Sequence, residues 1–144
     1  MPDWITQGFV EYAERLPSDF QLSLIEIANI KRTKNSDLKK IQHDEGQQIL
    51  EKVPPHNFII ALDEHGVECD TLQLANHLQK WRENWQNICF IIGGPEGLAT
   101  ECLNKAHFKL ALSRLTFPHP LVRVIVAEQI YRAWTILNKH PYHR

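Results

Sequence analysis

The chain has 144 residues, of which 43% are hydrophobic and 23% charged, and its formal net charge is −1. This is typical of one soluble globular domain, and the near-neutral charge excludes a protein that coats nucleic acid non-specifically. No apolar stretch reaches the roughly 20 residues that cross a bilayer, and the N-terminus lacks the basic and apolar segments of a signal peptide, so we expect a cytoplasmic protein without membrane association. Three cysteines without C-x-x-C spacing indicate neither a disulfide framework nor a zinc site.

The first half of the chain predicts two helices with a strand between them. The first helix follows Pro2 and ends before Pro17, and the apolar run Leu22–Ala28 predicts the strand. A loop over residues 29–36 carries Lys31, Arg32 and Lys34. The second helix is capped by Ser36 and stopped by Pro54.

The second half predicts strands that alternate with helices. Unbroken apolar strands are expected at Phe58–Leu62 and Ile88–Ile92, with a further strand at Phe108–Leu112. Helices are expected from about residue 70, over Thr100–Ala106 and over Leu121–Asn138. This alternation predicts an α/β fold with a parallel sheet, in a single domain over residues 1–144.

The segment Gly93-Gly94-Pro95-Glu96-Gly97 follows the second apolar strand. Open α/β sheets bind ligands at the carboxyl ends of their strands, and glycine allows close backbone approach. The spacing matches neither a dinucleotide fingerprint nor a phosphate-binding P-loop. A tight turn and a ligand-binding loop are equally compatible with this segment.

Two further loops are expected near the same edge of the sheet. Leu62 and Asp63 end the neighbouring strand, and Asp63 fits either a ligand-facing position or a loop cap. The loop Ser113–Pro120 is unusually apolar and holds His119 between two prolines, which restrict the backbone on either side. This histidine fits either a site residue or a structural hydrogen-bonding group.

Basic and aromatic groups gather towards the C-terminus. Arg132 belongs to the polar side of the final helix, and Tyr142, His143 and Arg144 follow in the tail. Solvation is the usual explanation of such charges, but beside these aromatic groups they are also suited to bind phosphates and to stack on a base. His140 and His143 lack further ligands, so we expect no metal.

Four segments resemble one known family. They are Ile91–Gly97, Leu115–Val124, Glu128–Trp134 and His140–His143, and the similarity continues upstream through Leu24–Ile27, Lys31-Arg32 and Asp44–Gly46. Together they are similar to the RlmH family, the ribosomal RNA large-subunit methyltransferases H of the SPOUT (α/β-knot) class. Their order along almost the whole chain makes a chance match improbable.

This resemblance implies an S-adenosylmethionine-dependent enzyme that methylates N3 of pseudouridine 1915 in 23S rRNA of the assembled ribosome. It further implies a homodimer with a C-terminal trefoil knot, a feature otherwise nearly absent from proteins. The cofactor contacts carried over from the family fall at Leu62, Gly93 and Gly94, and along Leu112, Ser113, Arg114, Leu115, Thr116 and Phe117.

The resemblance also implies that the sheet lacks the family's first strand. Relatives carry a short apolar strand and a glycine turn before the segment that matches Met1–Trp4. A misassigned start codon is the favoured explanation, and loss of the strand from the molecule is the alternative.

For the chemistry, alignment of the methyl donor with N3 is the main task, and a neutral histidine suits removal of the N3 proton. His119 and His143 are the candidates, while Arg132, Tyr142 and Arg144 are expected to bind RNA. Two other functions are compatible with the sequence. One is a SPOUT methyltransferase of another RNA, and the other is a non-catalytic ribosome-binding module.

Overall fold

The computed structural model describes residues 2–28, 30–85 and 87–144. They form two compact units, each built from segments that are distant in the sequence. The first unit contains Met1–Leu24, Cys69–Glu83 and Phe117–Arg144, and the second contains Ile25–Glu68 and Asn84–Thr116. We describe each unit by itself, and the single domain expected from the sequence stays a prediction.

The second unit contains a parallel sheet of three strands in the order β2-β1-β3. The strands are β1 (Asn57–Glu68), β2 (Asn87–Ile91) and β3 (Phe108–Ala111), and both neighbours of β1 run parallel to it. The α/β class and the parallel sheet predicted from the sequence are therefore confirmed.

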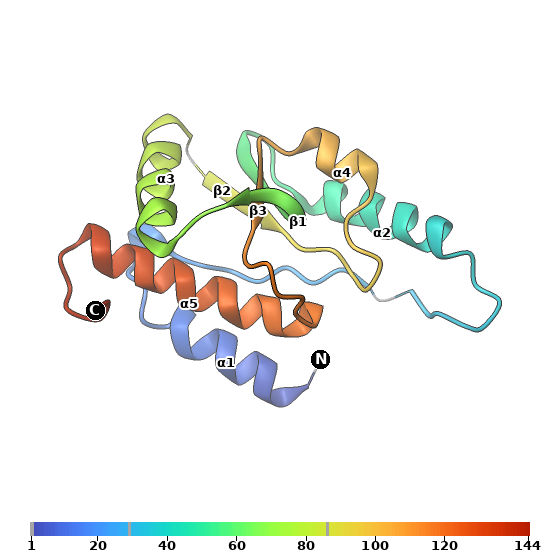
Figure 1. Ribbon diagram of the computed structural model, residues 1–144, viewed down its shortest axis with the longest axis horizontal. Coiled ribbons are helices and arrows are strands. Elements are labelled where there is room, and N and C mark those ends of the chain that lie inside the picture. Colours follow the sequence, from blue (N-terminus) through green and yellow to red (C-terminus); the bar gives the residue numbers. More distant parts are fainter. Residues whose placement is uncertain (1, 29, 86) are drawn as a thin grey trace. The chain divides into compact units, whose positions relative to one another are not determined.

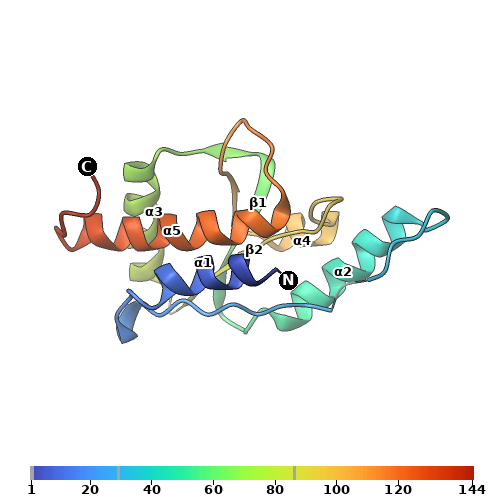
Figure 2. The same ribbon diagram turned by 90° about the horizontal axis from the view of Figure 1, so that it is seen from below.

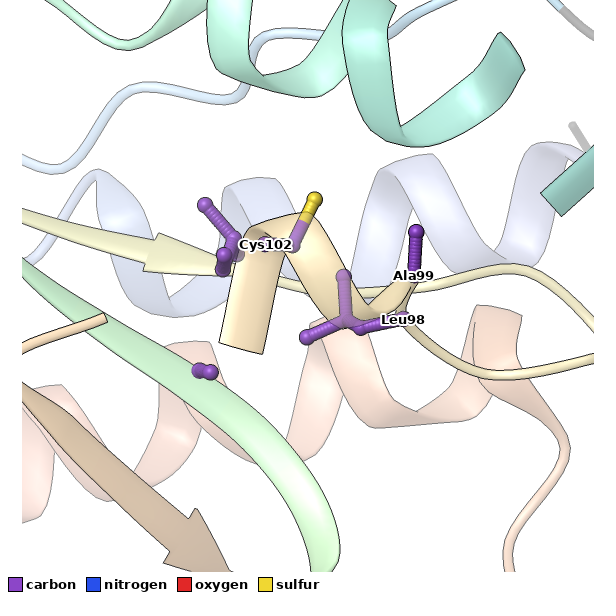
Figure 3. Close-up of a cluster of buried hydrophobic side chains, with 5 residues drawn as sticks. Leu98, Ala99 and Cys102 are labelled. Atoms are coloured by element: carbon purple, nitrogen blue, oxygen red, sulfur yellow. The ribbon is translucent and has the colours of Figure 1, made fainter. Parts of the chain in front are cut away.

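Two helices of this unit, α2 (Leu38–Lys52) and α4 (Thr100–Lys105), lie side by side (Figure 1). Buried Ala61 and Ile91 of the sheet share a core with Leu98, Ala99 and Cys102 at the start of α4. Figure 3 shows Ala99 and Cys102 pointing towards α2. A Cβ atom on Gly46 of α2 would lie only 2.7 Å from the Cβ of Ala99, so α2 packs tightly against the start of α4.

The first unit is helical and consists of α1 (Asp3–Ala13), a 3-10 turn η1 (Ser18–Phe20), α3 (Thr71–Asn84) and α5 (His119–Leu137). Helix α1 lies alongside α5 (Figures 1 and 2), and Gly8 packs against Val124 where the two helices meet. Helix α3 is tied to α5 by the Thr71 hydroxyl, which donates to Gln129 Oε1 at 2.9 Å.

The expected helices are all present, with small differences at their ends. Asp37 rather than Ser36 caps α2, because its carboxylate accepts from the backbone N–H groups of Lys39 and Lys40. Helix α5 begins at His119, two residues earlier than expected. No described helix is both long enough and apolar enough to cross a membrane.

The prediction of a strand over Leu22–Ala28 is wrong. In the structure these residues have no regular hydrogen-bonded pairing, and the side chain of Ile25 is 55% exposed. The apolar run predicts an extended backbone, but a strand also needs a partner, and no described strand pairs with it. The loop predicted over residues 29–36 begins at Asn29, which lies outside the described residues.

Candidate active site

The glycine segment after β2 is a tight turn. The Gly97 N–H donates to the Gly94 carbonyl at 2.9 Å, and Pro95 occupies the second position of the turn, which its fixed φ favours. Gly97 has a φ of 81°, in the left-handed region that glycine tolerates. At Gly93, a Cβ atom would lie 2.5 Å from the Gly97 carbonyl carbon. The turn itself thus requires two of these glycines, and ligand binding by the segment stays a prediction.

Strand β1 continues beyond Leu62, where the sequence predicted its end. Regular pairing with β3 nevertheless breaks there, because Leu110 of β3 is the partner of both Leu62 and Val67. Residues 63–66 lie between these paired positions, and Gly66 approaches the Lys109 carbonyl so closely that a Cβ atom would lie 2.6 Å from its oxygen. Leu62 and Asp63 are both half-buried at this break.

The segment after β3 carries the remaining residues for which the resemblance implies cofactor contacts. Ser113 Oγ accepts from the Leu115 N–H at 3.0 Å, which closes a local turn. Leu112 and Ser113 are half-buried, whereas Arg114, Leu115 and Thr116 are exposed, and the Leu115 side chain is 73% exposed. Phe117 belongs to the first unit, so it is described apart from the rest of this segment.

Within the second unit, Leu62, Gly93 and Leu112 therefore lie at or just beyond the last regularly paired residues of three parallel strands. Parallel strands end at the same edge of a sheet, the edge at which open α/β sheets bind ligands. Of the residues proposed to contact a cofactor at this edge, Leu62, Leu112 and Leu115 offer apolar side chains, and Gly93 and Gly94 offer only backbone N–H and C=O groups. Such a set suits a ligand with an apolar ring and a few polar groups better than a polyphosphate.

The sequence analysis missed a charged cluster that holds the glycine turn. Arg32 donates to both carboxylate oxygens of Glu96, from Nε at 2.7 Å and from Nη2 at 2.6 Å, and Nη2 also donates to Glu45 Oε1 at 2.8 Å. These hydrogen bonds raise the pKa of Arg32, with Glu96 as the largest cause. The sequence analysis placed Arg32 in a basic loop with Lys31 and Lys34. In the structure the charge of Arg32 is instead neutralised by Glu96 and Glu45 inside the unit. The sequence contained one signal for this cluster, because Arg32, Glu45 and Glu96 carry opposite charges and each lies in a segment that resembles the family.

In the first unit, a second cluster contains two of the predicted RNA-binding residues. Arg132 donates to Glu128 Oε1 from Nε at 2.7 Å, and its guanidinium lies over the Tyr142 ring at 4.9 Å. The Tyr142 hydroxyl donates to the same carboxylate oxygen at 3.3 Å. The hydrogen bond to Glu128 raises the pKa of Arg132, and burial is the main cause that raises the pKa of the Tyr142 phenol.

His143 belongs to this cluster as well. Its Nδ1 lies 3.0 Å from Nη1 of Arg132, and because a guanidinium only donates, Nδ1 accepts. The neutral ring then carries its proton on Nε2. Arg132, Tyr142 and His143 are thus brought together, RNA binding by this cluster stays a prediction, and Glu128 is the member that sequence reasoning missed.

The other predicted residues of the first unit lie outside this cluster. His119 is half-buried in the first turn of α5, where the sequence had predicted a loop, because Pro120 suits the start of a helix. Arg144 is exposed at the C-terminus. Among the described residues, no group of three His, Cys, Asp or Glu side chains is arranged to hold a metal ion.

Comparison with known proteins defines the class. Residues 1–143 match a family described as predicted SPOUT methyltransferase. The chain belongs to this family and is therefore a methyltransferase.

Three curated relatives narrow this class, and all three are named ribosomal RNA large subunit methyltransferase H. The proteins of Coxiella burnetii (strain Dugway 5J108-111), Methylococcus capsulatus (strain ATCC 33009 / NCIMB 11132 / Bath) and Marinomonas sp. (strain MWYL1) are 56%, 51% and 50% identical to this chain. Each match covers 100% of this chain and 93% of the relative. The chain belongs to the RlmH family of SPOUT methyltransferases, as its motifs predicted.

Proposed function

We propose that this protein is an S-adenosylmethionine-dependent methyltransferase of 23S rRNA, acting on N3 of pseudouridine 1915 in the assembled ribosome. The single observation that carries the proposal is the identity of 50–56% over the whole chain to relatives named as ribosomal RNA large subunit methyltransferases. The family-like motifs support the finer assignment of base, atom and ribosomal context.

S-adenosylmethionine supplies the methyl group, as is typical of SPOUT methyltransferases. The residues proposed to bind it are Leu62, Gly93 and Gly94, with Leu112, Ser113, Arg114, Leu115, Thr116 and Phe117. Those in the second unit fit this ligand, because it carries no phosphate and its adenine ring needs apolar neighbours and backbone partners. A Cβ atom on Gly97 would meet nothing within 4 Å, so the backbone of the turn is open on that side.

His119 is the proposed acceptor of the N3 proton. Of the two histidine candidates, His143 is already engaged in the observed arrangement, because its Nδ1 lies 3.0 Å from Nη1 of Arg132. A neutral imidazole is suited to general-base chemistry near pH 7. The role that follows for His143 is to orient Arg132.

Arg132, Tyr142 and Arg144 are the proposed RNA contacts. The guanidinium of Arg132 binds a carboxylate through two of its nitrogens, a geometry that suits an RNA phosphate equally well. The Tyr142 ring already contacts the Arg132 guanidinium at 4.9 Å and the Tyr131 ring at 4.8 Å, so a base that stacks on it competes with these neighbours.

We further propose that the protein is cytoplasmic, that it forms a homodimer, and that its C-terminal segment forms a trefoil knot. Light scattering on the purified chain measures the mass in solution directly. A monomeric mass at working concentration would contradict the dimer.

Mass spectrometry of 23S rRNA tests the function. A strain that lacks the gene is expected to lose the methyl group from pseudouridine 1915, and a plasmid copy is expected to restore it. Loss of a methyl group from a different RNA would favour the alternative substrate. Unaltered methylation, together with no S-adenosylmethionine binding in calorimetry, would favour the non-catalytic ribosome-binding module.

A further inference from the structure

The glycine turn is held in place by side chains from outside its own segment. Arg32 donates hydrogen bonds to both carboxylate oxygens of Glu96, which lies 64 positions later in the sequence. From α2, Gln42 Nε2 donates to the carbonyl oxygens of Glu96 at 2.8 Å and Leu98 at 3.2 Å. Both the side chain and the backbone of the turn are therefore held by side chains from elsewhere in the sequence.

Glu45 completes this arrangement beneath the turn. It is only 7% exposed, and its carboxylate accepts from the same Arg32 nitrogen that binds Glu96. A Cβ atom on Gly94 would lie 3.0 Å from Glu45 Oε1 and 3.2 Å from Arg32 Nη2. The backbone of the turn thus rests directly on the ion pair.

This cluster differs from an ordinary surface salt bridge in two ways. The Arg32, Glu45 and Glu96 side chains are 25%, 9% and 17% exposed, so solvent screens their charges less than those of an exposed pair. Without Arg32, two carboxylates would also face each other beside the turn, and their repulsion would displace Glu96. Arg32 therefore links Glu96 of the Gly94–Gly97 turn to Glu45 and separates the two negative charges.

We propose that Arg32, by joining Glu45 to Glu96, positions the Gly94–Gly97 turn for binding S-adenosylmethionine. This proposal rests on the proposed function, which assigns that ligand to Gly93 and Gly94. Arg32 is a positioning residue, because it acts on the backbone of the turn and needs no contact with the cofactor. A turn already fixed before binding loses less conformational freedom when the ligand arrives.

The test combines a measurement of the turn with a measurement of ligand affinity. The variants are Arg32→Ala, Arg32→Lys, Glu96→Gln and the double variant Arg32→Ala/Glu96→Gln. Hydrogen–deuterium exchange of the Gly97 amide reports the turn, because this N–H donates to Gly94. Calorimetry gives the Kd for S-adenosylmethionine, and steady-state assays give separate KM values for the cofactor and for ribosomes.

Arg32→Ala is expected to speed exchange at Gly97 and to raise the Kd for S-adenosylmethionine by about tenfold, with the KM for ribosomes within about twofold of wild type. Glu96→Gln should act in the same direction, and the double variant should be no worse than Arg32→Ala because the two residues act as a unit. For Arg32→Lys, the exchange rate at Gly97 and the Kd should both lie between those of wild type and Arg32→Ala, since lysine keeps the charge but cannot bind a carboxylate in a bidentate way.

His43→Ala is the matched control. His43 also lies on α2 and pairs with Glu101 at 3.0 Å, but both side chains are about half exposed and the pair does not touch the turn. Exchange at Gly97 and the Kd should both stay at wild-type values.

Unchanged exchange at Gly97 in Arg32→Ala and Glu96→Gln would overturn the inference, whether or not the cofactor binds. So would faster exchange with an unaltered Kd, since the turn would then not control affinity. If wild-type protein shows no binding, the proposed function fails, and the assignment of the turn to a cofactor fails with it.

Discussion

Two arginine–glutamate pairs carry very different structural roles in this molecule. Arg132 binds Glu128 four residues earlier on the same helix, whereas Arg32 binds Glu96 from a distant part of the chain. A pair within one helix is worth only a few tenths of a kcal/mol, and the helix forms without it. The long-range pair fixes one segment against another, so its loss moves the backbone.

The two arginines therefore differ in whether they can exchange their carboxylate partner. Arg132 is able to leave Glu128 for another anion while α5 stays intact, which suits contact with a substrate that comes and goes. Arg32 cannot leave Glu96 without releasing the glycine turn. The first pair is thus suited to transient binding, and the second to preorganisation.

The largest expected effect comes from removing the exchangeable arginine. Arg132→Ala should lower kcat/KM for rRNA methylation by at least about a hundredfold, because the substrate loses a contact that aligns it. The Kd for S-adenosylmethionine should stay within about twofold of wild type, and Tyr142→Ala should show the same pattern. Methylation assays on whole ribosomes, with calorimetry alongside, measure both quantities.

Arg15→Ala is the control for this prediction. Arg15 also pairs with a glutamate one helical turn away, Glu11, and its guanidinium also lies over a tyrosine ring, that of Tyr131 at 5.4 Å. Methylation should be normal in this variant. A large loss of cofactor affinity in Arg132→Ala would contradict the division between exchangeable and fixed arginines.

Next in size is a change in the packing beneath the turn. Gly46→Ala places a methyl group 2.7 Å from the Cβ of Ala99, and such overpacking costs about 1–3 kcal/mol. The melting temperature should fall, and cofactor affinity should fall with it because α2 also carries Glu45. Gly8→Ala, with its nearest atom at 3.2 Å, should be milder and leave the affinity unaltered. Equal affinity losses in both variants would argue against a local effect.

A smaller effect is expected from the lysines that flank Arg32. Lys31 and Lys34 are exposed, so the double variant Lys31→Gln/Lys34→Gln tests whether they bind rRNA phosphates or are simply solvated. Phosphate contact predicts a severalfold weaker ribosome affinity and a salt dependence reduced by up to about two charges. An unchanged salt dependence would identify a solvated loop.

The smallest effect is spectroscopic. Burial raises the pKa of Tyr142, so its phenol keeps its proton to higher pH and goes on donating to Glu128. An absorbance titration should therefore contain a tyrosinate component above the ordinary value of about 10, and Tyr142→Phe should remove it. Persistence of that component in Tyr142→Phe would mean that another tyrosine produces it.

The fold was largely predictable because the apolar patterns report local structure directly. The predicted runs at Phe58–Leu62 and Ile88–Ile92 lie in parallel strands that pair with each other over residues 58–61 and 88–91. The helix expected from about residue 70 is present as α3. Leu22–Ala28 failed because pattern alone does not supply a partner strand.

The candidate site was predictable only in part. The family-like motifs identified Gly93, Arg132 and Tyr142 as candidate site residues. The contacts of Arg32 and Glu128 were not predicted, because they depend on which side chains meet after folding. Glu128 was accessible in principle, since a glutamate four residues before an arginine is a known helical pairing. Nothing in the periodicity of the chain places Arg32 beside Glu96.

The interruption of β1 has an evolutionary consequence. Because Leu110 is the partner of both Leu62 and Val67, the four residues from 63 to 66 are a spacer between two paired positions. Their number can change without shifting the alternation of side chains on either flank, provided that a glycine stays where the chain crosses Lys109. Homologous chains should therefore tolerate insertions here more readily than in the rest of the strand, and an affinity tag placed between Glu64 and His65 should leave the pairing of the sheet undisturbed.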